Sequence, residues 1–227
     1  MLQADVWAAL VPGLAFWPLC FAVCRATGLL NDPRGNTQLP SVLFSSTISL
    51  YLIQSDCVTI GRTFADGTGI GSPNTPHQVL AMAWTACWFA VDMAHDLYIG
   101  ERDAAMLAHH VFGVAVCALP LALGLGSTEV CTFLALAEVS TPLLGLSRAY
   151  KGRPQGPALE IAFALTFICV RGYGMTALLP FVVRSSTHFA IKALSVALCS
   201  ISYLWIVLIA KKLVRKLCGR SRSQKTS

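Results

Sequence analysis

Residues 92–110 read DMAHDLYIGERDAAMLAHH, and this stretch decides how the rest of the chain is interpreted. It places two aspartates and a histidine near the end of one apolar segment, then a charged turn, then two adjacent histidines early in the next apolar segment. Ionisable side chains inside a membrane cost free energy, so they usually pair with one another or serve a function. The stretch therefore predicts a polar cluster shared by two neighbouring helices.

The composition around this stretch is typical of an integral membrane protein. Of the 227 residues, 55% are hydrophobic and only 12% are charged, whereas about a quarter are charged in ordinary soluble domains. Seven apolar runs approach the length of about 20 residues that a membrane-spanning helix needs. They cover residues 6–23, 39–54, 79–98, 106–125, 130–146, 158–183 and 190–210. We therefore expect an all-α membrane protein of about seven transmembrane helices, with a loop of about 20 residues between the second and third.

The positions of the basic residues predict the topology. With a cytoplasmic C-terminus, thirteen of the 17 Lys and Arg residues fall in inside segments and two, Arg62 and Arg184, in outside loops. Because cytoplasmic segments carry an excess of Lys and Arg, the N-terminus is expected to be lumenal or extracellular. Seven basic residues in the last 17 positions predict contact with anionic lipid headgroups. We expect no nucleic-acid partner, since no folded basic domain accompanies this tail.

The side chains of Asp92, His95 and Asp96 project from one helical face, because they are spaced at i, i+3 and i+4. His109 and His110 lie about 100° apart around their helix, so at most one should point at the carboxylates. A carboxylate that orients an imidazole raises its basicity, which suits a general base or an acyl-accepting nucleophile. We therefore predict Asp92, Asp96, His109 and His110 as catalytic residues. The structural alternative is an Asp–His pair that ties two helices together.

Metal chemistry is a further alternative for these residues. The chain has five histidines, without the repeated HxxxH and HxxHH spacing of di-iron desaturases, and its nine cysteines form no CxxC zinc spacing. Zinc held by Asp92, Asp96 and one of the two adjacent histidines remains open. Our expectation is that no metal is bound.

Glu138 and Arg171 form a second predicted polar pair. Counted from the ends of their apolar runs, both fall near the middle of the bilayer, where a lone charge costs at least ~2.5 kcal/mol. Pairing is therefore favoured over two isolated charges, either as a structural contact or for binding a lipid headgroup. Together with Trp88 and His95, these two residues are our predicted substrate-binding residues.

Two motifs resemble those of the TLC-domain membrane proteins, a group that includes the ceramide synthases. One is Arg102-Asp103 followed by Met106 and the His109-His110 pair, and the other is the segment LAEVSTP at residues 136–142 with Arg148 after it. The second motif looks like that of the transmembrane-protein-56-like branch. Ceramide synthases carry an HD-x-x-D run where this chain has Glu138 and Pro142, so the similarity to them is distant.

The resemblance implies a barrel of six or seven membrane helices around a central cavity for a lipid or fatty acyl chain. It also implies the endoplasmic reticulum or another cell membrane, and we expect the endoplasmic reticulum rather than the plasma membrane. In ceramide synthases the double histidine serves acyl transfer, which implies acyl-CoA as a co-substrate here and no other cofactor. We thus divide the chain into an N-terminal anchor (1–38), a TLC-type domain (39–212) and a basic cytoplasmic tail (213–227).

The function expected from these observations is in lipid homeostasis or membrane lipid composition, with acyl-CoA-dependent transfer to a sphingolipid or phospholipid as the reaction. A non-catalytic lipid-sensing or cargo-binding protein would use the same cavity. A seven-helix receptor or transporter is less favoured, because the chain has no strong internal repeat and its polar residues cluster in one half of the bilayer.

Overall fold

The computed structural model describes residues 2–28, 33–100 and 104–223, with side chains described within 6–28, 38–100 and 104–215. Every regular element in these ranges is helical. The elements are α1 (Leu2–Thr27), α2 (Pro33–Asp66), α3 (Pro76–Tyr98), α4 (Ala104–Leu123), α5 (Ser127–Glu138), α6 (Thr141–Ala149), α7 (Gly156–Phe167), the π-helical segment η1 (Ile168–Gly174), α8 (Met175–Arg184) and α9 (Phe189–Ser223). Arg102 and Asp103 of the first family motif lie outside the described residues.

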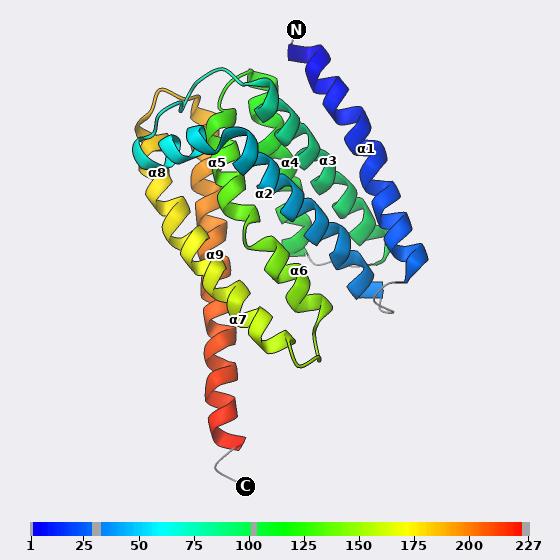
Figure 1. Ribbon diagram of the computed structural model, residues 1–227. Helices are drawn as coiled ribbons and strands as arrows, with labels where there is room; N and C mark the ends of the chain where they lie inside the picture. The colour runs from blue at the N-terminus through cyan, green and yellow to red at the C-terminus, as the bar shows by residue number, and fades with distance from the viewer. Residues whose placement is uncertain (1, 29–32, 101–103, 224–227) are drawn as a thin grey trace.

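The chain runs back and forth along the bundle (Figure 1), with α5 and α6 forming one passage and α7, η1 and α8 another. Loops 67–75, 124–126 and 185–188 gather at one end, where Pro73 forms a β-bridge with Leu125. Asn74 also donates its backbone N–H to the carbonyl of Gly124 at 3.0 Å. Helix α1 starts at this end of the bundle and α9 finishes at the other, which agrees with an odd number of passages through the bundle.

Among the residues that the structure describes, five helical segments are long and apolar enough to cross a membrane: Val6–Thr27, Ala104–Leu123, Ser127–Ala149, Gly156–Arg184 and Phe189–Arg215. Large apolar side chains on α1 and α9 face outward, among them Trp7, Leu19 and Leu204, each more than half exposed. Such a surface is stable against lipid and unfavourable against water. Helices α2 and α3, which are not among the five, carry many polar residues and pack among the others. The chain is a multi-pass, all-α membrane protein.

The predicted loop after residue 54 is wrong, because α2 continues to Asp66 and leaves a loop of residues 67–75 only. A kink at Asp56, with φ −148° and ψ 27°, divides this helix. Beyond the kink, Ile60, Thr63 and Phe64 are at i, i+3 and i+4 and face the core. This spacing stabilises a helix by burying one face, which outweighs the polar and glycine content that indicated a loop.

Two other predicted spans are interrupted. The fifth breaks at Val139 and Ser140, just before Pro142, whose ring nitrogen cannot donate to a helical hydrogen bond. The sixth contains the π-helical segment η1, which includes Arg171. The last span is longer than predicted, since α9 continues through the start of the basic tail to Ser223 and extends beyond the bundle (Figure 1).

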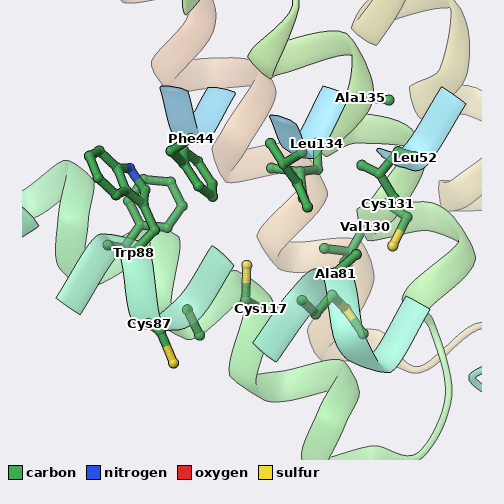
Figure 2. Close-up of a cluster of buried hydrophobic side chains, with 14 of the residues drawn as sticks. Phe44, Leu52, Ala81, Cys87, Trp88, Cys117, Val130, Cys131, Leu134 and Ala135 are labelled. Atoms are coloured by element: carbon green, nitrogen blue, oxygen red, sulfur yellow. The ribbon is translucent and has the colours of Figure 1, made fainter. Parts of the chain in front are cut away.

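Local sequence explains how α3, which carries much of the candidate site, is positioned. Its N-terminus is closed by a capping box, in which Thr75 and Gln78 satisfy each other's backbone N–H groups, with Pro76 in the first turn. It ends before Gly100, whose φ of 81° is accessible to glycine at little cost. One face of α3 packs on α1 and another on α4. Figure 2 shows the adjoining core, where Trp88 of α3 and Phe44 of α2 lie face to face.

Candidate functional site

A buried cluster of Asp92, Asp96 and His110 lies where the end of α3 meets the start of α4. The Nε2 atom of His110 is 3.4 Å from Oδ2 of Asp96 and 3.7 Å from Oδ2 of Asp92. The His110 side chain is 4% exposed and each aspartate side chain 19%. The structure therefore brings together three of the four predicted catalytic residues and selects His110 as the histidine that faces the carboxylates.

Close contact between α3 and α4 makes this cluster possible. A Cβ atom added to Gly113 would lie 2.6 Å from the ring of Phe89, so only glycine allows the helices to approach this closely. The Phe89 ring in turn lies edge-on to both imidazoles, with centroid distances of 5.6 Å to His109 and 6.0 Å to His110. Phe89 and Gly113 therefore set the height and separation at which His110 meets the two aspartates.

The hydrogen-bonding capacity of His110 is unused. Neither ring nitrogen has a hydrogen-bond partner, although both are buried. Charge-assisted hydrogen bonds are shorter, about 2.7–2.9 Å, than the separations from Nε2 to the aspartates. A buried polar group without a partner costs free energy and so requires an explanation. The cluster has the arrangement expected of a site that receives a proton or a ligand.

His109 faces a different part of the interior. Its ring contacts are to Phe89 and to His110, and the charge of Arg171 is close enough to act on its imidazole. The Asp–His cluster and the Arg171 region are thereby connected through the adjacent histidines of α4. The sequence alone could not show which way His109 and His110 each point, because this depends on how α4 is rotated against α3.

Glu138 and Arg171 are neighbours, as their predicted depths implied. Arg171 donates from Nη2 to the carbonyl of Ala137 at 3.0 Å, and its guanidinium lies 4.8 Å from the centroid of the Phe167 ring. Glu138 is 6% exposed, makes a side-chain hydrogen bond with Thr141, and interacts electrostatically with Arg171. Nε of Arg171 has no partner. The backbone carbonyl of Ala137, at the break between α5 and α6, therefore helps to hold Arg171 near Glu138.

The remaining predicted substrate-binding residues, Trp88 and His95, lie on the side of α3 that faces α1. His95 stacks on Phe21 with a centroid distance of 4.3 Å. Trp88 is 3% exposed and packs between Phe21, Phe44 and Trp17; Figure 2 shows its contact with Phe44. The contacts that surround these two residues are therefore aromatic packing contacts, and their part in substrate binding stays a prediction.

A second polar cluster, which the sequence did not reveal, lies at the other end of the bundle. Glu129 is 0% exposed and accepts the backbone N–H of Gly71 through Oε1 at 3.0 Å. Nearby, Gln78 donates to Thr128 at 3.1 Å and to Asp56 at 3.4 Å. In the sequence, this cluster is indicated only by an acidic residue, Glu129, at the start of an apolar run after the glycine turn at 124–126. This cluster joins loop 67–75 to α5.

Only one group of residues within the described ranges has the geometry to hold a metal ion. Asp92, Asp96 and His110 each offer one ligand atom, and these atoms all lie within 4.8 Å of one another. His109 is not part of the group. Of the two histidines that the sequence left open as zinc ligands, the geometry therefore favours His110.

The family comparison covers most of the bundle. The family model described as the TLC domain matches residues 38–211, which include α2 after its first turn and extend into α9. The matched range contains the Asp–His cluster, Glu138 and Arg171. This chain therefore belongs to the TLC-domain family.

Proposed function

We propose that this protein alters membrane lipid composition by transferring a fatty acyl group from acyl-CoA to a lipid acceptor, with His110 as the general base. The observation that carries the proposal is the buried His110 imidazole, whose Nε2 lies 3.4 and 3.7 Å from two carboxylates. Membership of the TLC-domain family supports a lipid substrate. No cofactor is required beyond acyl-CoA itself.

The chemistry follows from the two ring nitrogens. The aspartates face Nε2 and favour the tautomer with its proton there, which leaves the lone pair of Nδ1 available as a base. The amine or hydroxyl of the acceptor attacks the thioester carbonyl and gives its proton to Nδ1. The carbon–sulfur bond breaks, and the imidazolium returns the proton to the leaving thiolate of coenzyme A. Asp92 and Asp96 stabilise the imidazolium during this step.

Glu138, Arg171 and His109 supply the polar wall against which the substrate headgroup would lie. The partly unused guanidinium of Arg171 suits a phosphate or carbonyl oxygen. His95 and Trp88 would support the site from the α1 side.

The favoured location is the endoplasmic reticulum membrane, with a lumenal N-terminus and a cytoplasmic C-terminus. The distribution of Lys and Arg supports this topology, which places the end of α3 near the cytoplasm, where acyl-CoA is available. The α9 extension then brings Lys211 and Arg215 to anionic headgroups, while Lys212 is paired with Glu160 of α7 at 3.0 Å. A glycosylation acceptor inserted in loop 67–75 should be modified and one in residues 150–155 should not; the reverse pattern would exclude this orientation.

The activity is tested by comparing wild type, His110→Ala and His77→Ala at equal protein level. His77 is exposed at the other end of α3 and serves as the matched control. The two measurements are coenzyme A release by purified protein and the lipid composition of expressing cells. Loss of both effects in His110→Ala alone supports the proposal. Catalysis is rejected if cells expressing wild type and His110→Ala have the same lipid profile and purified wild type releases no coenzyme A above background.

Non-catalytic lipid sensing is the second candidate. It is favoured by one observation, the presence of Glu138 and Pro142 in the region where ceramide synthases carry their acidic run. This function predicts a lipid that co-purifies with the protein and no turnover of acyl-CoA. Mass spectrometry of extracts from equal amounts of folded wild type and folded Arg171→Met would detect it, because loss of the guanidinium should reduce the amount of bound lipid.

A further inference from the structure

We infer that Asp92, Asp96 and His110 form a binding site for one divalent transition-metal ion, with Zn²⁺ the best-matched probe. The inference departs from the sequence-based expectation of no metal, and the binding itself does not depend on the proposed acyl transfer. It rests on the positions, burial and charges of these three side chains.

The distances suit a metal ion better than a hydrogen bond. Two ligands bound to one tetrahedral Zn²⁺ at about 2.0–2.1 Å lie roughly 3.3–3.4 Å apart. The separations from His110 Nε2 to the two Oδ2 atoms are 3.4 and 3.7 Å, close to this value. The three ligand atoms lie within 4.8 Å of one another, so the carboxylates need only small side-chain rotations to converge.

The second observation is the unsatisfied imidazole. His110 is 4% exposed, Nε2 points into the space between the aspartates, and neither nitrogen has a hydrogen-bond partner. A neutral imidazole nitrogen beside two carboxylate oxygens is a donor set that zinc accepts in proteins. Each aspartate side chain is 19% exposed, whereas His110 is 4% exposed, so an ion would approach the site from the side of the aspartates.

Charge also favours a divalent ion. In the metal-bound state, two ionised aspartates and a neutral histidine would contribute a charge of −2, which the divalent ion would cancel in this apolar setting. The charge of Arg148 on α6 also acts on Asp92. Three protein ligands leave a fourth position of the ion open, as in zinc sites that bind water or a substrate.

Occupation by metal excludes the base role of His110. A neutral imidazole has one proton, so coordination through Nε2 moves that proton to Nδ1 and removes the lone pair that would accept the acceptor's proton. Zinc is therefore expected to inhibit acyl transfer, and this consequence alone rests on the proposed function.

The test uses full-length protein in lipid nanodiscs, purified through a tag without histidine. After exposure to ZnCl₂ and removal of free metal, the zinc content of wild type, His110→Ala, Asp96→Asn and His77→Ala is measured by mass spectrometry. Wild type and His77→Ala should retain about one ion more per chain than the other two variants. The affinity of His110→Ala for zinc should be at least about tenfold lower, since even supporting residues around a metal have effects of this size.

Two additional measurements distinguish loss of the metal site from misfolding of a variant, and binding at this site from binding by cysteine thiolates. Zinc should raise the thermal unfolding temperature of wild type but not of the near-isosteric Asp96→Asn. The Co²⁺ form should show the visible bands of a tetrahedral nitrogen and oxygen site without a thiolate charge-transfer band. Equal zinc retention in wild type and Asp96→Asn, or a thiolate band, would overturn the inference.

The inference and the proposed function can fail separately. Zinc retention without coenzyme A release in the metal-free protein would reject acyl transfer and leave the metal site. Coenzyme A release without site-dependent zinc retention would reject the metal site and leave the enzyme. If both hold, adding zinc should abolish turnover and a chelator should restore it.

Discussion

Arg171 donates a hydrogen bond from Nη2 to the backbone carbonyl of Ala137 at 3.0 Å, which joins η1 to the end of α5. The carbonyl is accessible because α5 ends at Glu138 and α6 begins at Thr141, so regular helical bonding is interrupted there. Arg171 thus binds a helix end through the Ala137 carbonyl, and its charge acts on the nearby Glu138 carboxylate. The π-helical turn carries this guanidinium.

We predict that Arg171→Met lowers the free energy of unfolding by about 3–5 kcal/mol, because it leaves the Glu138 charge buried without compensation. Glu138→Gln introduced into the Arg171→Met background should recover part of this loss. The measurement is denaturant unfolding of the two single variants and the double variant in detergent. If the two losses simply add, the residues do not interact and this interpretation is wrong.

The approach of α3 to α4 gives a second prediction. Gly113→Ala should destabilise the protein by about 1–3 kcal/mol, since its Cβ would meet the Phe89 ring at 2.6 Å. Gly61→Ala on α2 is the matched control, because no atom lies within 4 Å of its added Cβ. That variant should be unchanged or stabilised by up to about 1 kcal/mol. Thermal unfolding distinguishes them, and equal stability of the two variants would contradict the close contact.

The sequence predicted those features that depend on helical spacing alone. The positions of Asp92 and Asp96 relative to His110 follow from the lengths of two helices and the short turn between them. The choice of His110 over His109 does not, because it depends on the rotation of α4, which Gly113 and Phe89 determine through packing.

Other features were missed because tertiary contacts override local pattern. Residues 57–66 resembled a loop, but burial of Ile60 and Phe64 keeps them helical. The π-helical turn around Arg171 has no sequence signature that we could recognise. The role of Glu129 depends on a loop that is distant in sequence, since its partner is the backbone of Gly71.

That contact between Glu129 and Gly71 gives a third prediction. Glu129→Ala removes the acceptor of a part-buried N–H, which should cost about 1–3 kcal/mol and release loop 67–75. Glu129→Gln retains an acceptor oxygen and the side-chain shape, so it should be milder. Limited proteolysis should cut the loop faster in Glu129→Ala than in wild type. Equal cleavage rates would show that other contacts, such as the bond from Thr63 Oγ1 to the carbonyl of Thr68 at 2.7 Å, suffice to hold the loop.

The last prediction concerns how much each of the two aspartates contributes to the function of His110. If His110 is the general base, His110→Ala should lower acyl transfer by about 10²–10⁴-fold. Asp92→Asn and Asp96→Asn should each have a smaller effect, because either remaining carboxylate can still stabilise the imidazolium. The double variant should lose no more than His110→Ala, since residues that act as one unit have non-additive effects.

Asp66→Asn provides the control, because it makes the same chemical change at an exposed position beside the loop at the other end of the bundle, where Asp66 accepts hydrogen bonds from Thr68. Its turnover should equal that of wild type. The kinetics of coenzyme A release should be measured in metal-free buffer, so that zinc does not mask the base. If the double variant loses far more activity than His110→Ala, the aspartates contact the substrate directly. Stabilisation of the imidazolium then cannot be their main role.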